Sequence, residues 1–325
     1  MRVTTGASSS SSVPGSVVSN LPPDKVRRMN PIAGSELDAF LARGRVAVED
    51  ALARAVPPLG SPPPSLHEAM RYTLLLPGKR LRGILVLASC ELLKGKGDDA
   101  LPLACAVEMV HASSLILDDL PSMDDATLRR GKPTLHKVVG EANAILAAVA
   151  LLNAAFAAIE EAPALKDRAR VAAASRLAEA VGASGLIGGQ VADLEATGTK
   201  IDLDALEYIH SHKTGALFIA AAELGAIAAS GRARDLEALR RYAKNLGLAF
   251  QITDDLLDYS GNPGTTGKDA GLDRDRTTFV NLCGIDGARR LADELIVASL
   301  AALQPFGRRA EILAGLAEMV RERDR

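Results

Sequence analysis

Four carboxylates interrupt an apolar helical pattern at residues 115–125, which read Leu115-Ile116-Leu117-Asp118-Asp119-Leu120-Pro121-Ser122-Met123-Asp124-Asp125. A single charged cluster is most often the solvated face of a helix. Here the flanking residues are typical of a core, and burying unpaired carboxylates costs several kcal/mol each. The pattern therefore predicts a cationic partner for this cluster.

A second acidic cluster closes another apolar segment, Phe250-Gln251-Ile252-Thr253-Asp254-Asp255-Leu256-Leu257-Asp258. Asp254 and Asp258 are four residues apart and share one helix face, where they repel each other unless a cation lies between them. Carboxylates without neighbouring histidine or thiolate favour Mg²⁺, which completes its coordination with water and phosphate oxygens. Two such clusters facing each other would hold a diphosphate through bridging Mg²⁺.

Two glycine-flanked basic segments supply the complementary charge, and they read Gly78-Lys79-Arg80-Leu81-Arg82 and Leu128-Arg129-Arg130-Gly131-Lys132-Pro133. Arginine offers bidentate donors to phosphate, and lysine offers a point charge. His111 precedes Asp118 by two helical turns and can line the same cavity, although a lone helix histidine is more often structural. Lys213 and Lys268, each taken alone, are typical of surface lysines.

From Ser35 to the end of the chain, apolar residues recur at three- and four-residue spacing, and runs in which β-branched residues alternate with polar ones are scarce. We therefore expect an all-α chain, folded as one large helical bundle around a central cavity over residues 31–325. Short breaks are expected near residues 57–64, 95–98, 131–133, 162–163, 197–200 and 230–231. The longer polar break at 260–276 is a candidate lid. Residues 1–30 are serine-rich without apolar periodicity, and we expect a disordered N-terminal extension.

Composition limits the class of protein further. Hydrophobic residues make up 48% of the 325 residues and aromatic residues 3%, which excludes disordered and collagenous chains. Lysine and arginine number 38 against 40 acidic residues, so the chain has no overall positive charge that would attract nucleic acid.

Cys90, Cys105 and Cys283 lie in apolar runs and are predicted to be reduced core residues. The apolar stretch 142–159 is alanine-rich with two asparagines, which predicts a buried helix and no transmembrane segment. The expected location is cytoplasmic, with organelle targeting by residues 1–30 as the alternative.

The two acidic motifs, in this order and with these basic segments, resemble trans-isoprenyl diphosphate synthases, the polyprenyl synthetase family that makes geranylgeranyl and farnesyl diphosphates. The resemblance runs from about Leu74 to Leu282. It implies a prenyltransferase with a single all-α bundle around a deep cavity, usually a homodimer. It also implies that three Mg²⁺ ions bridge an allylic diphosphate to both acidic motifs, and that isopentenyl diphosphate is the second substrate.

The same resemblance assigns roles residue by residue. Metal binding falls to Asp118, Asp119, Asp124, Asp254, Asp255 and Asp258. The isopentenyl diphosphate site matches Lys79, Arg82, His111 and Arg130, and contacts to the allylic substrate match Arg129, Lys213, Thr214, Gln251 and Lys268. Asp118, Asp119, Asp254 and Lys213 are the expected catalytic residues. Gln190 and Asp193 match a further family segment, with a role in cavity lining and helix packing.

The chain departs from the family pattern at a few positions. Leu117 stands where many members carry histidine, Gly83 replaces a common proline, and Ala148-Val149 replaces a usual Gly-Asp pair. Arg276 stands where lysine is usual. None of these departures removes a metal or diphosphate ligand.

Product length is expected to depend on the cavity floor below the first acidic motif. In this family the position five residues before the first aspartate forms that floor, and here Ser113 and Ser114 are both small. Met109 lies about one turn further back, 5.4 Å along the helix, where it would meet a lengthening tail. We expect mainly geranylgeranyl diphosphate, and we expect Ser113→Phe to shorten the product.

Three alternatives stay open. A farnesyl diphosphate synthase shares every motif and differs in product length. A terpene cyclase also uses an aspartate-rich motif with Mg²⁺, but it needs no second diphosphate site, which Lys79, Arg82, His111 and Arg130 are expected to form. A non-catalytic partner subunit of another synthase is the alternative of a different class.

Overall fold

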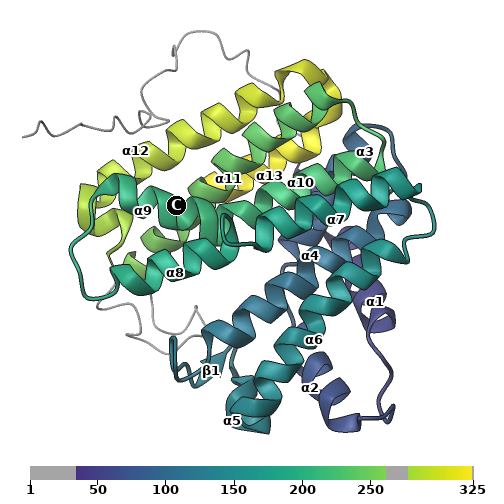
Figure 1. Cartoon of the computed structure of the whole chain (residues 1–325). Helices are drawn as coiled ribbons and strands as arrows, with labels where there is room; N and C mark the ends of the chain where they lie inside the picture. Colours follow the sequence, from purple (N-terminus) through teal and green to yellow (C-terminus); the bar gives the residue numbers. More distant parts are fainter. Residues whose placement is uncertain (1–33, 261–276, 324–325) are drawn as a thin grey trace, which may run out of the picture.

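A computed structural model describes residues 34–260 and 277–323 of the chain. The predicted N-terminal extension at residues 1–30 lies outside the described residues, and so does the predicted lid after Ser260. Figure 1 shows that the described part is a bundle of helices, with α4 near its centre and α11, α12 and α13 along one side. The predicted all-α fold is confirmed.

The helices follow one another with short connections. They are α1 (Gly34–Ala55), α2 (Pro64–Leu74), α3 (Leu81–Leu92), α4 (Gly97–Asp118), α5 (Leu135–Val139), α6 (Glu141–Glu160), α7 (Asp167–Val181), α8 (Leu186–Ala196), α9 (Leu203–His210), α10 (Ala216–Ala228), α11 (Ala233–Ser260), α12 (Phe279–Ala302) and α13 (Glu311–Glu322). A π-helical turn, Ser211–Gly215, joins α9 to α10, and a 3-10 segment, Gln304–Ala310, precedes α13. Among the described residues the only strands are β1 (Leu128–Arg129) and β2 (Lys132–Pro133), an antiparallel hairpin. The short breaks predicted from the sequence fall at this hairpin and between the helices.

The core lies where α4 packs against α3, α6 and α10. Small residues allow these helices to approach closely. A Cβ atom on Gly225 of α10 would lie 2.2 Å from the carbonyl oxygen of Val86 on α3, so only glycine fits at this crossing. Tyr242 of α11 is fully buried, and its hydroxyl donates to the carbonyl of Leu313 at 2.7 Å, which ties α11 to α13.

The first acidic cluster straddles the end of a helix. The prediction that all four carboxylates lie within one helical run is wrong in its second half, because α4 ends at Asp118 and Asp119 is its C-cap. The Asp124 amide donates to the carbonyl oxygen of Asp118 at 2.9 Å, so the chain after the helix curls back. This turn brings Asp124 to the cavity that Asp118 lines.

Two of the three predicted core cysteines are buried. Burial raises the pKa of Cys90 to about 11 and that of Cys105 to about 12, so both are protonated near neutral pH. The prediction for Cys283 is wrong, because this residue is exposed in the first turns of α12. Residues 281–286 are exposed there, and Gly284, at φ 71°, interrupts the helical backbone beside it.

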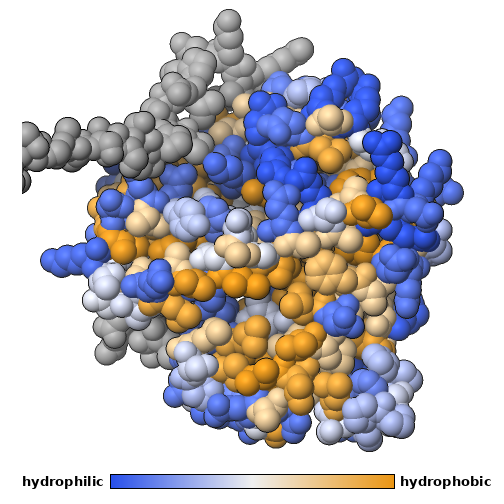
Figure 2. Space-filling view, in the orientation of Figure 1, coloured by the Kyte–Doolittle hydropathy of each residue, from blue (hydrophilic) through white to orange (hydrophobic). Residues whose placement is uncertain are grey.

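Within residues 34–260 and 277–323, two helices, α4 and α6, are long and apolar enough to cross a membrane by length and composition alone. The most apolar window of α4 is 67% buried, as befits a core helix, but that of α6 is only 33% buried. The prediction that α6 is a buried helix is therefore wrong for its outer side, where Ile145, Leu146 and Val149 are exposed. Figure 2 shows apolar residues gathered over the face that α6 and α8 form in Figure 1.

Candidate active site

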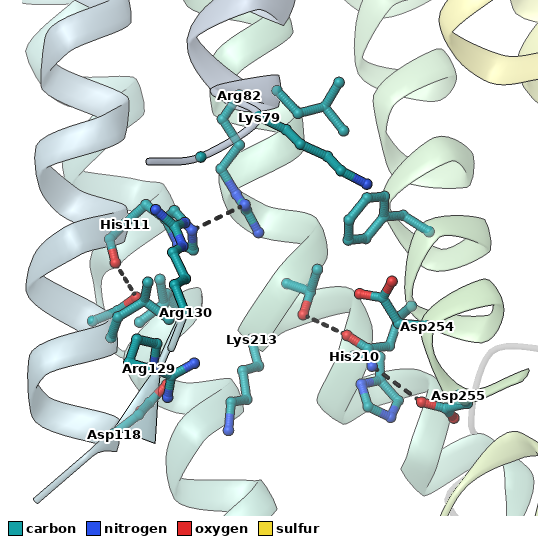
Figure 3. Close-up of a pocket in the computed structure, with 18 of the residues that line it drawn as sticks. Lys79, Arg82, His111, Asp118, Arg129, Arg130, His210, Lys213, Asp254 and Asp255 are labelled. Atoms are coloured by element: carbon teal, nitrogen blue, oxygen red, sulfur yellow. Dashed lines mark hydrogen bonds between the residues drawn. The ribbon is translucent and has the colours of Figure 1, made fainter. Parts of the chain in front are cut away.

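A cavity of about 630 Å³ lies between the C-terminal end of α4, the start of α3, the π-helical turn and α11. Most of the residues predicted for the site line it. They are Lys79, Arg82, His111, Ser114, Asp118, Asp124, Arg129, Arg130, Lys213, Thr214, Gln251, Asp254, Asp255 and Asp258. Asp119, Ser113 and Met109 are buried outside the lining, and Lys268 lies outside the described residues. In Figure 3 Asp118 and Asp254 lie on opposite sides of the cavity, with Lys213 between them.

The first acidic wall is formed by the end of α4 and the turn that follows it. Asp118 faces the cavity there, whereas Asp119 forms an ion pair with Arg129. Burial raises the pKa of Asp118 to about 6, although Lys213 and Arg129 act in the opposite direction. Asp119 is buried and accepts hydrogen bonds from Nε and Nη2 of Arg129. The β1–β2 hairpin that follows the cluster carries Arg129, so the local turn brings its own counter-ion to the wall.

The second acidic wall lies on α11. Burial raises the pKa of Asp255 to about 6. Both of its oxygens are already in use, because Oδ1 accepts from Nε2 of Gln251 at 3.1 Å and Oδ2 accepts from the amide of Phe279 at 3.0 Å. Thr214 donates to Oε1 of the same Gln251 at 3.2 Å. A chain of hydrogen bonds therefore runs from the predicted substrate contacts to the second acidic motif and on to the start of α12.

The basic end of the cavity is built around Arg82. Its guanidinium lies 4.8 Å from the ring centroid of Phe218, and its Nη1 lies 3.4 Å from Nε2 of His111. Burial and the neighbouring Arg82 lower the pKa of His111 well below its usual value, so the imidazole is neutral near pH 7. Burial also lowers the pKa of Lys79, with Arg323 acting in the same direction.

Arg130 fixes the backbone that precedes Arg82. Its Nη1 donates to the carbonyl oxygens of Pro77 at 3.2 Å and Leu76 at 3.4 Å. A Cβ atom on Gly78 would lie 2.6 Å from the same Nη1, so this glycine leaves room for the arginine. The two basic segments, far apart in the sequence, are thus joined directly in space.

Arg80, the middle cation of the first basic segment, also lines the cavity but lies between two carboxylates. It is buried and lies 3.5 Å from Glu49 and 3.7 Å from Glu108. The Glu108 carboxylate also accepts from the amide of Gly83 at 2.9 Å. The family departure at Gly83 therefore has a structural role, because proline has no amide hydrogen to donate.

Lys213 is held by helix α8. Its Nζ lies 2.7 Å from Oδ2 of Asp193. A Cβ atom on Gly189, one turn before Asp193, would lie 2.2 Å from the backbone nitrogen of Lys213. The glycine allows α8 to approach the π-helical turn closely enough for the ion pair to form. π-Helical turns are frequent at functional sites.

The two serines below the first acidic motif point in different directions. Ser113 is buried, and its Oγ donates to the carbonyl oxygen of Ala148 on α6 at 2.9 Å. Ser114 lines the cavity, and its Oγ donates to the carbonyl oxygen of His111. Met109, further back on α4, is fully buried in the core.

The carboxylates fit Mg²⁺ that is bound together with a phosphate ligand. Among the residues that the structure describes, no three His, Cys, Asp or Glu side chains lie close enough to form a metal site by themselves. Carboxylates, which are hard oxygen donors, lie at both acidic walls, and burial has raised the pKa of Asp118 and Asp255, so their ionised forms need a cation. Mg²⁺ keeps coordination positions for water and phosphate oxygens, which suits two separated walls.

Sequence reasoning missed several residues of this site. Among the lining residues it missed are Leu186, His210, Phe250 and Glu108. Arg323, which follows α13, lines the cavity and forms an ion pair with Asp254, their Nη1 and Oδ1 atoms 3.0 Å apart. No motif surrounds Arg323 in the sequence, so only the three-dimensional packing identifies it.

Comparison with known proteins agrees with this geometry. The polyprenyl synthetase family model matches residues 63–296. The chain belongs to the polyprenyl synthetase family. The chloroplastic geranylgeranyl pyrophosphate synthase of Capsicum annuum is 44% identical over 290 residues, which cover 88% of this chain and 78% of that one. The chloroplastic heterodimeric geranylgeranyl pyrophosphate synthase large subunit 1 of Arabidopsis thaliana is 43% identical over 299 residues, covering 90% of this chain and 79% of the relative.

Solved structures of this family share the fold. An FPP/GFPP synthase from Zymomonas mobilis superposes with a TM-score of 0.81 at 35% identity, over 89% of this chain and 100% of the other. A geranyltransferase from Helicobacter pylori, solved with magnesium and isoprenyl diphosphate, gives a TM-score of 0.79 at 30% identity, over 90% and 98% of the two chains. The predicted family and the predicted enzyme class, a prenyltransferase, are confirmed.

Proposed function

We propose that this polyprenyl synthetase condenses isopentenyl diphosphate head to tail with an allylic diphosphate, and that its main product is geranylgeranyl diphosphate. The observation that carries the proposal is the single cavity in which two acidic walls face a separate basic end. Such a cavity has room for two diphosphates, whereas a terpene cyclase needs one. The names of the plant relatives support the product, because both describe geranylgeranyl pyrophosphate synthases.

Each group of residues has its own task in this reaction. Lys79, Arg82, His111 and Arg130 bind the diphosphate of isopentenyl diphosphate, and Arg129, Lys213, Thr214, Gln251 and Lys268 bind that of the allylic substrate. Asp118, Asp119, Asp124, Asp254, Asp255 and Asp258 would hold three Mg²⁺ ions. These ions, when bound, supply Lewis-acid stabilisation of the departing diphosphate. Because Asp119 is paired with Arg129, its role requires that arginine to turn toward the substrate.

The chemical step is an ionisation followed by condensation and elimination. The allylic carbon–oxygen bond breaks, and its electron pair leaves with the diphosphate, whose charge Lys213 and Arg129 stabilise. The double bond of isopentenyl diphosphate attacks the allylic cation, and a proton is then lost to the departed diphosphate. Apolar residues such as Leu115 and Leu186 on the cavity wall exclude water, which would otherwise capture the cation.

In this proposal the size of the side chain at position 114 determines product length. Ser114 lines the cavity, whereas Ser113 faces the α6 backbone and Met109 is buried in the core. The small side chain at Ser114 leaves the space below the first acidic motif open to a growing tail. An open floor favours geranylgeranyl diphosphate over farnesyl diphosphate, which is shorter.

The exposed apolar face of α6 supports a homodimer. Five apolar side chains on two helices are more than 40% exposed, namely Ile145, Leu146 and Val149 on α6 and Ile187 and Val191 on α8. Apolar patches of this kind mark protein interfaces. A second copy of this chain would cover them. Val149→Arg should give a monomer by analytical ultracentrifugation, whereas Val297→Arg on α12 should leave the dimer intact.

The activity is tested with the full chain alone. Radiolabelled isopentenyl diphosphate and Mg²⁺ are supplied with dimethylallyl, geranyl or farnesyl diphosphate, and the products are separated by chain length. We expect geranylgeranyl diphosphate and no product after chelation of the metal. Farnesyl diphosphate as the final product would establish the shorter synthase. Absence of any condensation with every primer would overturn the enzyme assignment in favour of a non-catalytic partner subunit.

The cytoplasmic location stays a prediction. The relatives named above are chloroplastic proteins. Residues 1–30, on which the alternative of organelle targeting depends, lie outside the described part of the chain.

A further inference from the structure

Each acidic wall of the cavity carries one arginine. Arg129 pairs with Asp119 on the first wall, and Arg323 pairs with Asp254 on the second. The two ion pairs differ in their hydrogen bonding. Arg129 donates hydrogen bonds to both oxygens of Asp119, which is buried. Arg323 places a single nitrogen, Nη1, 3.0 Å from Asp254, and this nitrogen has no hydrogen-bond partner among the described residues. The contact on the second wall is therefore ionic and easily exchanged.

The fold presents Arg323 to the cavity from the end of α13. Two contacts fix this helix against its neighbours, since Tyr242 of α11 donates to Leu313 at 2.7 Å and Arg321 reaches Asp293 of α12 at 2.7 Å. The guanidinium of Arg323 lies 4.5 Å from the ring centroid of Phe250, one turn before Asp254 on α11. The aromatic face holds the cation at the wall without using its hydrogen-bond donors.

The surroundings explain why a cation is needed here. Asp254, Asp255 and Asp258 lie within one turn of α11 and all line the cavity, so their charges repel one another. The side chain of Asp254 is 32% exposed and that of Arg323 is 21% exposed, so both are open to exchange with a soluble ion. A divalent cation that binds Asp254 would lie close to the guanidinium, and the repulsion between the two positive charges makes them compete for this carboxylate.

We propose that Arg323 is the exchangeable counter-ion of the second acidic wall: it neutralises Asp254 in the metal-free protein and competes with Mg²⁺ for this carboxylate. The proposal rests on the metal-binding role of Asp254 in the proposed function. Its consequence is that free Mg²⁺ binds weakly and is loaded efficiently only with a diphosphate, whose negative charge attracts the released guanidinium. Arg323 thereby acts as a positioning residue that sets the order of loading.

The test measures metal binding without turnover. Mn²⁺ replaces Mg²⁺, and the electron paramagnetic resonance signal of free Mn²⁺ gives the affinity of the full-length protein with no diphosphate present. We expect Arg323→Gln to bind Mn²⁺ about fivefold more tightly than wild type, the factor expected when an ion pair of this exposure no longer competes. Arg308→Gln, which removes the same charge from an exposed position paired with Glu311 away from the cavity, should match wild type. Circular dichroism checks that each variant is folded.

The Asp254→Asn variant distinguishes a failure of the counter-ion proposal from a failure of the metal assignment in the proposed function. In this background the added Arg323→Gln change should bring no gain in Mn²⁺ affinity. If Asp254→Asn weakens binding but Arg323→Gln binds no more tightly than wild type, the counter-ion proposal is overturned and the metal site stands. If Asp254→Asn leaves Mn²⁺ affinity unchanged, both without and with inorganic pyrophosphate, the metal assignment in the proposed function fails.

Discussion

The ammonium of Lys213 lies 2.7 Å from Oδ2 of Asp193, which joins the π-helical turn to helix α8 across the cavity wall. Both side chains are largely buried, at 20% and 14% exposure, so the pair is screened less than a surface ion pair. The aspartate holds the lysine at the position where we propose that the allylic diphosphate departs.

Asp193→Asn should lower kcat/KM for the allylic substrate by about 10- to 100-fold, because a hydrogen bond to a charged group contributes about 1.5–3 kcal/mol. The KM for isopentenyl diphosphate should change much less, since Lys79 and Arg82 lie at the other end of the cavity. Steady-state kinetics with each substrate varied in turn provide the measurement. Asp204→Asn on α9 is the matched control. Equal losses for both substrates would contradict a specific role for Asp193.

Gly189→Ala should destabilise the protein and reduce its activity. The new Cβ atom would lie 2.2 Å from the backbone nitrogen of Lys213, so α8 must move away from the π-helical turn. Overpacking of this kind costs about 1–3 kcal/mol in the free energy of unfolding, which chemical denaturation measures. Gly215→Ala is a suitable comparison, because its Cβ atom would meet only the carbonyl oxygen of His210 at 3.6 Å. Equal costs for the two variants would show that the close approach at Gly189 is unimportant.

Ser114→Phe should shift the product from geranylgeranyl to farnesyl diphosphate, because the aromatic ring would occupy the cavity below Asp118. Ser113→Phe should act on stability instead, since its side chain lies between α4 and α6 and its hydroxyl is bonded to Ala148. Chromatography of the products and thermal denaturation of both variants distinguish these effects. If Ser113→Phe shortens the product and leaves the stability normal, the cavity floor is formed by Ser113 and not by Ser114.

Because of His111, the ligand-free protein should be less stable in mild acid than at neutral pH. The folded-state pKa of this histidine lies well below 6.5, so the unfolded chain takes up a proton that the folded chain does not. The contribution is present above about pH 6.5 and is lost as the pH falls toward the folded-state pKa, by at most about 1.4 kcal/mol per pH unit for one proton. His111→Gln should show a smaller loss of stability between pH 7 and pH 5.5. Identical pH profiles for the two proteins would mean that His111 titrates normally.

The sequence predicted the parts of the site whose signal is local. Carboxylates inside apolar segments need a cation wherever they fold, so Asp118 and Asp254 were identifiable without a structure. Neighbouring positions on a helix point about 100° apart, and the pattern could not decide which of Ser113 and Ser114 faces the cavity. Arg323 was missed for a different reason, because its role comes from packing of α13 on α11 and no nearby residue marks it.

Asp255 links the chemistry of the cavity to the frame of the protein. Its Oδ2 is the acceptor for the amide of Phe279, the first residue of α12. A cation or proton bound at this oxygen would weaken its hydrogen bond to that amide, and so would loosen the start of a helix that packs along α11. The rate of hydrogen exchange at the Phe279 amide should therefore change when a ligand binds in the cavity, and this measurement needs no label on the ligand.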